Sequence, residues 1–194
     1  MIVTRVGPDP PFYRALPPRW AYLPESGAGA AIGGGRFNRI GLEARYLALT
    51  PHCALEEYRA TAALVPPATI VCYSVTAEDV VDFTGAYSAE QWSPIWAEAY
   101  CNWRQLALYD NVEPPSSKIG NLVSNAGYAG ILYGSAVDAT GTCLVLYPRN
   151  STRFTARCTI RTSCSRATPI PGDSRPETSC QETRAVTAGA AYRP

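Results

Sequence analysis

The strongest constraint on the fold is a strand that leads directly into a short helix between residues 43 and 67. Residues 43–50, EARYLALT, carry the bulky, partly alternating side chains of a half-buried strand. Thr50 offers a hydroxyl cap for a helix, and Pro51 suits the first helical position, where the missing backbone donor costs nothing. Prolines at 66 and 67 end this helix, which is predicted over 51–64.

The remaining strands are predicted from apolar, β-branched runs. They lie at 69–75, 129–134 and 142–148, with a short edge strand at 153–160. Short strands interleaved with few helices are typical of an α+β fold, so we expect one domain with a mixed β core flanked by a few helices.

Two further helices are predicted. Ser88 and Gln91 form a capping box ahead of a long helix through 92–108, whose start Pro94 delays. This helix has an apolar stripe that we expect to face the core: Trp96, Tyr100, Trp103 and Ala107. The other helix covers 116–125, with Gly127 in a C-capping role.

The composition changes near residue 150. Residues 151–194 hold seven arginines against three acidic residues, with many Ser and Thr and few large apolar side chains. We therefore expect a folded domain over 1–150 and a basic tail over 151–194 that is at least partly disordered. The alternative for the tail is a basic arm that grips an acidic partner.

Charge and hydropathy exclude several classes of protein. A net charge of +1 gives no reason to expect nucleic-acid or membrane binding. No apolar run approaches the about 20 residues needed to cross a bilayer, and the N-terminus lacks the apolar core of a signal peptide, so a cytoplasmic location is expected. The seven cysteines form no CxxC pair, so we expect reduced thiols without a zinc or redox role.

The residue inventory also argues against common catalytic arrangements. The single histidine, His52, directly precedes Cys53, and neighbouring helical residues diverge by about 100°, so the two do not pair and His52 is expected at the surface. No zinc-ligand spacing appears, so no metal is expected. The glycine run at 27–35 follows no strand, Lys118 is the only lysine, and GSAVD (134–138) lacks the second glycine of a nucleophile elbow.

One glycine-rich stretch remains, GGGRFN at 33–38. Glycines at 34 and 35 let the backbone approach a ligand closely and free amide groups for an anion. A planar guanidinium such as that of Arg36 is the natural partner of a phosphate. The alternative is a flexible turn with a solvated arginine.

The helix predicted over 51–64 carries two adjacent carboxylates. At 100° per residue its apolar stripe is formed by Leu55, Tyr58 and Ala62. Glu56 lies opposite that stripe, where it can pair with Arg59 at i+3. Glu57 borders the stripe and can reach the wall of a cleft.

Tyr46, inside the strand before this helix, is either a core residue or an aromatic wall with a polar hydroxyl. An arginine for phosphates, an aromatic wall and one carboxylate suit cleavage of the nicotinamide–ribose bond of NAD+. The carboxylate stabilises an oxocarbenium-like centre, and the good leaving group needs neither a metal nor a histidine.

Residues 26–58 resemble the opening signature of the RES-domain toxins, which are the toxin halves of bacterial toxin–antitoxin pairs. The shared pattern is Gly-Gly-Arg-aromatic-Asn, then Gly, a Leu-Tyr-Leu strand and a helix with a Glu. The spacings of ten from Arg36 to Tyr46 and eleven from Tyr46 to Glu57 also agree. The strand GILYGSAV resembles the segment with the family's serine, which places it on Ser135, and the resemblance covers about residues 5–148.

The resemblance implies a fold similar to ADP-ribosyltransferases, NAD+ as substrate and an Xre-like antitoxin that occludes the site. By position it implies catalytic roles for Arg36, Tyr46, Glu57 and Ser135. It implies NAD+-binding roles for Gly34, Gly35, Arg36, Asn38 and Tyr46.

The expected function is growth arrest by NAD+ cleavage, with water or phosphate as the acceptor. The alternative, known from one branch of the family, is ADP-ribosylation of a protein such as phosphoribosyl pyrophosphate synthetase. Two departures from the family pattern, Gly134 for a proline and Cys143 for an asparagine, leave open a non-enzymatic nucleotide-binding module.

Overall fold

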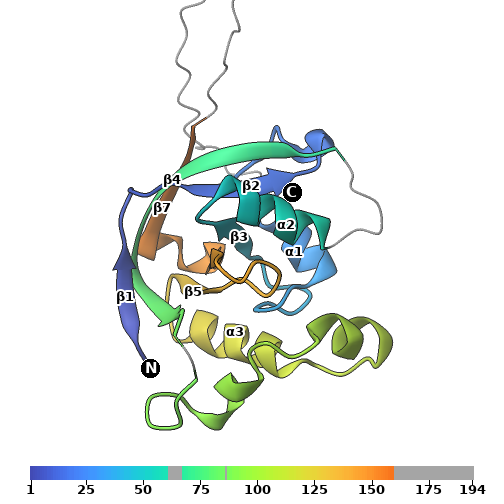
Figure 1. Cartoon of the computed structure of the whole chain (residues 1–194), viewed down its shortest axis with the longest axis vertical. Coiled ribbons are helices and arrows are strands. Elements are labelled where there is room, and N and C mark those ends of the chain that lie inside the picture. The colour runs from blue at the N-terminus through green and yellow to red at the C-terminus, as the bar shows by residue number, and fades with distance from the viewer. Residues whose placement is uncertain (61–66, 86, 160–194) are drawn as a thin grey trace, which may run out of the picture.

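The computed structural model describes residues 1–60, 67–85 and 87–159 (Figure 1). Its strands are β1 (Val3–Val6), β2 (Phe12–Leu16), β3 (Arg45–Ala48), β4 (Thr69–Phe83), β5 (Gly130–Gly134), β6 (Thr142–Leu146) and β7 (Phe154–Thr159). Its α-helices are α1 (Ala28–Gly33), α2 (Pro51–Arg59) and α3 (Pro115–Asn125). Short 3-10 turns are η1 (Pro18–Trp20), η2 (Pro94–Glu98) and η4 (Pro148–Arg153), and η3 (Gln105–Tyr109) is a π-helical turn.

The sheet is organised around the long strand β4, which bends across the molecule in Figure 1. It pairs with β1 and β2 along one edge and with β7 and β5 along the other. The pairings β4–β2, β2–β3, β3–β6, β6–β5 and β5–β4 form a closed ring. Closure leaves each of these five strands with a neighbour on both sides and gives the sheet an inner and an outer face.

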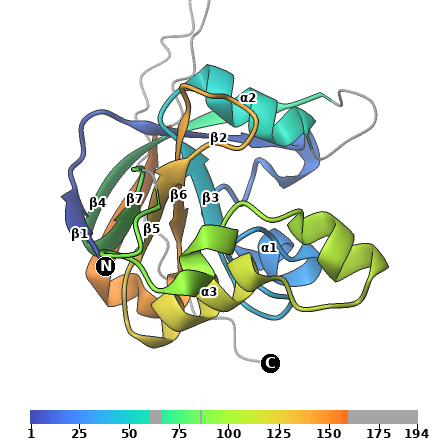
Figure 2. The same ribbon diagram turned by 60° about the horizontal axis from the view of Figure 1, so that its bottom comes forward.

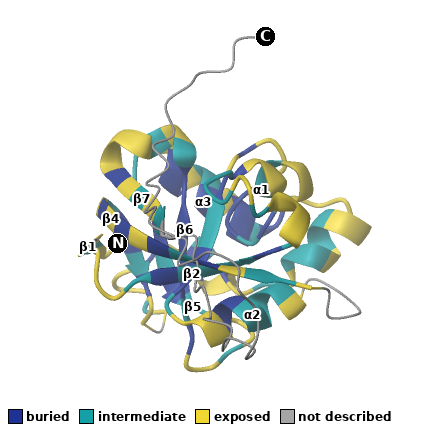
Figure 3. Ribbon diagram, turned by 90° about the horizontal axis from the view of Figure 1, so that it is seen from above, coloured by how far each residue is buried: buried dark blue, intermediate teal, exposed yellow. Residues whose placement is uncertain are grey.

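Both faces of the sheet are buried, and Figure 3 shows the buried residues concentrated along the strands. Leu144 and Leu146 of β6 belong to a core inside the ring, with Val71, Tyr73 and Val75 of β4. Cys143 and Val145 point the other way and belong to a second core. That core includes buried residues of α2, of α3 and of the segment 92–99. Alternation along β6 therefore divides the core into two halves, one on each face of the sheet.

Most predicted elements are confirmed. The strands at 43–50, 69–75, 129–134, 142–148 and 153–160 correspond to β3, β4, β5, β6 and β7, and the helices at 51–64 and 116–125 to α2 and α3. Thr50 caps α2, its Oγ1 accepting a hydrogen bond from the Cys53 amide at 3.0 Å. Gly127 follows α3 with φ +87°, as a C-capping glycine should. The α+β fold class is confirmed.

The long helix predicted through 92–108 is wrong. Residues 94–98 form a 3-10 turn and 105–109 a π-helical turn. The carbonyls of Ala99 and Cys101, which a continuous helix would pair with its own amides, accept hydrogen bonds from Arg36 at 3.2 and 3.1 Å. A contact with a residue more than 60 positions away thus interrupts the helix, and of its predicted core stripe only Trp96 is buried.

Three elements were not predicted from the sequence: β1, β2 and the short helix α1 within the glycine-rich run. The strand β7 lies beyond residue 150 and pairs with β4 over Phe154–Thr159. The tail expected to be partly disordered lies, from residue 160 onward, outside the described residues, as do positions 61–64 at the end of the predicted helix 51–64. None of the helices that the structure describes has the length and apolar character required to cross a membrane.

Candidate functional site

The segment that carries Arg36 is a rigid turn. Gly34 has φ +69°, a left-handed conformation that side chains disfavour, and Gly35 and Asn38 form an isolated antiparallel bridge. The Asn38 amide donates to the carbonyls of Ala30, Arg39 and Leu42 at 2.8, 3.1 and 3.0 Å. The turn is thus held by hydrogen bonds of its own backbone and of the Asn38 side chain.

The Tyr46 hydroxyl holds this turn from β3. It accepts a hydrogen bond from the Phe37 amide at 3.0 Å and donates one to Asn38 Oδ1 at 2.7 Å. A Cβ atom on Gly35 would lie 2.5 Å from that same hydroxyl, so only glycine fits beneath it. Burial raises the pKa of Tyr46 and keeps the hydroxyl protonated, which preserves both bonds.

Helix α3 closes on the turn from the opposite side. A Cβ atom on Gly120 would lie 1.8 Å from the Phe37 carbonyl oxygen, so helix and turn are in backbone contact. The Tyr147 hydroxyl donates to that same carbonyl at 2.9 Å. The Phe37 ring packs edge-on against Tyr133 at 4.8 Å between centroids. These contacts leave Arg36 as the side chain of the turn that points away from the core.

The Arg36 guanidinium lies against the segment 99–101. Its Nη1 donates to the two carbonyls already described, and its Cζ lies 5.5 Å from the centroid of the Tyr100 ring. Within residues 1–60, 67–85 and 87–159, no acceptor pairs with the Nε or Nη2 groups. The arginine is thus oriented by one nitrogen and retains donors for an anion.

Glu57 lies on the inward face of α2. The buried residues of this helix are Cys53 and Ala54, four and three positions before Glu57, whereas Leu55 and Tyr58 of the predicted apolar stripe are only half-buried and Ala62 lies outside the described residues. The predicted pair of Glu56 with Arg59 is confirmed at 2.7 Å, and His52 is exposed as expected.

Ser135 orients the Glu57 carboxylate. Its hydroxyl donates to Glu57 Oε1 at 2.7 Å and accepts from the amides of Val137 and Asp138, both at 3.1 Å. The Cys143 thiol lies 3.7 Å from the same carboxylate oxygen. In the described part of the chain, no donor bonds Oε2. One oxygen of the carboxylate is held, and the other is available to a ligand.

A pair of buried thiols lies beneath this carboxylate. Cys53 Sγ and Cys143 Sγ are 3.7 Å apart. Burial, together with the neighbouring Glu57 charge, raises the pKa of the Cys143 thiol. Cys143 therefore stays protonated and can serve as a weak donor to Glu57.

Two tyrosines connect the arginine to the carboxylate, and sequence reasoning missed both. Tyr100 lies under Arg36 and donates to the Gly134 carbonyl at 3.1 Å, one residue before Ser135. Tyr133 is buried, and this burial raises the pKa of its hydroxyl well above the ordinary value. Alternation back from Ser135 could have identified Tyr133. Tyr100 had no such signal, because it was predicted inside a helix.

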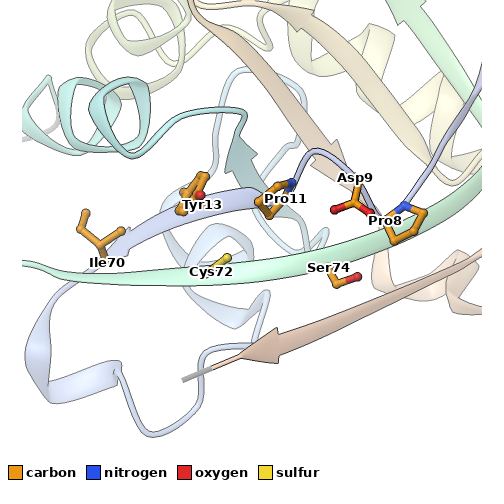
Figure 4. Close-up of a pocket in the computed structure, with 7 residues that line it drawn as sticks. All are labelled: Pro8, Asp9, Pro11, Tyr13, Ile70, Cys72 and Ser74. Carbon is orange, nitrogen blue, oxygen red and sulfur yellow. The ribbon is translucent and has the colours of Figure 1, made fainter. Parts of the chain in front are cut away.

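The surface has two hollows near these elements. One of about 300 Å³ is bordered by Gly34, Gly35 and Asn38 together with Trp103 and the segment 107–114. The other, of about 550 Å³, lies between the 8–11 loop, Tyr13 of β2 and Cys72 of β4 (Figure 4). Arg36, Tyr46, Glu57 and Ser135 line neither. The described residues contain no group of three or more His, Cys, Asp or Glu that could hold a metal ion.

Comparisons with known proteins agree with this architecture. The structure is similar to a chain of the crystal structure of the M. tuberculosis MbcT–MbcA toxin–antitoxin complex, with a TM-score of 0.52 and 22% sequence identity. The match covers 80% of this chain and 84% of that chain, and it shows a shared fold. A search of curated proteins found no match. A sequence profile described as the RES domain matches residues 11–169. Because that profile spans most of the sequence, the chain belongs to the RES domain family.

Proposed function

We propose that this chain is the toxin of a toxin–antitoxin pair and that it cleaves the nicotinamide–ribose bond of NAD+ in the cytoplasm. The observation that carries the proposal is the oriented Glu57 carboxylate, fixed at Oε1 by Ser135 and open at Oε2. Membership of the RES domain family and the fold shared with a toxin–antitoxin complex support it.

The proposed reaction breaks the bond between the ribose C1′ and the pyridinium nitrogen. Nicotinamide leaves with the bonding electron pair, and positive charge develops at C1′ and the ring oxygen. The free oxygen of Glu57 stabilises that charge, and water then adds to C1′ and releases a proton, giving ADP-ribose. Ser135 acts as a positioning residue, because its hydroxyl is already committed to Glu57 and to two backbone amides.

Arg36 takes the diphosphate in this proposal. Its Nε and Nη2 groups have no acceptor among the described residues and can donate to two oxygens of a phosphate. The hydrogen-bonded turn fixes the position of the Arg36 backbone. The roles of Gly34, Gly35, Asn38 and Tyr46 are to build that turn. Tyr46 acts through its hydroxyl bonds to the turn, so it is a positioning residue in place of the stacking wall considered from the sequence.

Adjacent carboxylates offer a matched test. Glu57→Gln keeps the size and one hydrogen-bonding oxygen but removes the charge, so NAD+ cleavage by the pure protein should fall by about 10²–10³-fold. Glu56→Gln, on the face paired with Arg59, should leave cleavage unchanged. Nicotinamide release is followed by chromatography, and circular dichroism checks the fold of both variants. Equal activity of Glu57→Gln and wild type would refute the proposed role of the Glu57 carboxylate in charge stabilisation.

The same preparation identifies the acceptor. Incubation with NAD+ labelled in the ADP-ribose part yields free ADP-ribose if water is the acceptor and ADP-ribose 1″-phosphate if phosphate is. Label on a protein band indicates transfer to a protein, and tight binding without nicotinamide release indicates a binding module. A cognate antitoxin that covers Arg36 and Glu57 should suppress every one of these products.

A further inference from the structure

The cavity of about 300 Å³ beside the Arg36 turn has no role in the chemistry above. It is lined by Gly34 and Gly35 of the turn, by Trp103 and by the apolar residues Leu108 and Val112. Figure 2 shows the segment that carries Trp103 running beside α1. Gly35, which lines this cavity, directly precedes Arg36, the proposed phosphate-binding residue.

We propose that this cavity is the subsite for the adenosine end of the dinucleotide. The proposal rests on the proposed NAD+ chemistry and adds to it the group that gives the enzyme its preference for a dinucleotide. Ligand sites commonly measure about 300–1,000 Å³. A cavity at the lower limit takes one end of NAD+, a nucleoside, and leaves the other end to Glu57.

A chain of contacts connects the cavity to Glu57 in the order of the groups in NAD+. Gly35 lines the cavity and precedes Arg36, whose Nη1 binds the carbonyl of Cys101, two residues before Trp103. Arg36 then lies over Tyr100, whose hydroxyl binds the Gly134 carbonyl. The next residue, Ser135, binds Glu57. Base pocket, cation and carboxylate thus follow one another as base, diphosphate and nicotinamide ribose do.

The chemistry of the cavity suits a purine. Trp103 presents an indole ring, and the Arg104 guanidinium lies 4.7 Å from its centroid and supports it from one side. Stacking on an aromatic side chain accepts any base face, and the exposed apolar residues Leu108 and Val112 offer further surface for the base to cover. Asn111 and Glu113 at the rim supply polar groups for the base edge or the ribose hydroxyls.

The test compares NAD+ with nicotinamide mononucleotide, which has the same scissile bond but no AMP moiety. The variant Trp103→Ala should lower the ratio of kcat/KM for NAD+ to that for the mononucleotide about tenfold, since one base stack is lost. Leu108→Trp, which fills the cavity from an exposed position, should lower the same ratio without removing a packed side chain. Tyr109→Ala, 78% exposed and outside the cavity lining, is the matched control and should leave the ratio unchanged.

Direct binding separates this inference from the proposed reaction. Titration of the wild-type protein with AMP, followed by calorimetry, should show binding that Trp103→Ala weakens about tenfold. AMP binding lost in this variant supports the subsite even if the protein cleaves no NAD+. Normal NAD+ cleavage without AMP binding, or with an unchanged substrate ratio in both cavity variants, overturns the subsite and leaves the proposed reaction intact. Failure of the wild type to bind AMP at millimolar concentration would also overturn it, and would leave the cavity to a protein partner.

Discussion

Removal of the Tyr46 hydroxyl tests whether β3 holds the arginine turn. In Tyr46→Phe the ring remains, but the Phe37 amide and Asn38 Oδ1 both lose their partner. Phe37 is fully buried and Asn38 is 1% exposed, so water does not easily replace the hydroxyl. A buried polar group left unpaired costs about 1–3 kcal/mol.

Two such groups predict a loss of about 3 kcal/mol or more in the free energy of unfolding. A domain of this size is stable by about 5–15 kcal/mol, so the variant should still fold. At about 2–4 °C per kcal/mol, the melting temperature should fall by about 6–12 °C. NAD+ cleavage should fall as well, through a higher KM, because the turn that aims Arg36 is loosened.

Urea unfolding followed by tryptophan fluorescence measures the free energy, and calorimetry measures Tm. The matched control is Tyr109→Phe, which removes a hydroxyl from a side chain that is 78% exposed and should stay within about 0.5 kcal/mol of wild type. If Tyr46→Phe is as stable as that control, the hydroxyl does not anchor the turn, and the positioning role assigned to Tyr46 is refuted.

Two further predictions concern packing and pH. Gly120→Ala should destabilise the fold by about 1–3 kcal/mol or more in urea titrations, because its Cβ would meet the Phe37 carbonyl oxygen at 1.8 Å. The control Gly29→Ala, whose Cβ would have nothing within 4 Å, should be neutral or slightly stabilising. Equal effects of the two variants would refute backbone contact between α3 and the turn. The pKa values of Cys143 and Tyr46 are raised by burial above their ordinary 9.0 and 10.0, so the folded chain keeps protons that the unfolded chain releases. These two groups should therefore leave the free energy of unfolding unchanged just below pH 8 and lower it above pH 9.0, by up to about 1.4 kcal/mol per pH unit for each group; urea titrations that stay constant from pH 8 to pH 10.5 would contradict this.

Local sequence signals determined much of the fold. Thr50 and Pro51 set the start of α2, Gly127 marks the end of α3, and alternation in 142–148 identifies β6. These signals work because capping, left-handed glycine conformations and side-chain alternation depend on a few neighbouring residues. The glycines of the motif GGGRFN likewise predicted a turn whose backbone approaches other groups closely.

What only the tertiary structure decided is which distant groups meet. Ser135 binds Glu57 across 78 positions, and Arg36 takes carbonyls 63 and 65 positions away, which interrupts the helix predicted there. The inward face of α2 was also decided by the tertiary structure, in which Cys53 and Ala54 are the buried residues of the helix. Periodicity reports only the local face of an element, whereas closure of the sheet and pairing of buried polar groups depend on the whole chain. The sequence by itself therefore determined the elements and the motif, and the closed sheet decided how Arg36, Glu57 and Ser135 are brought together.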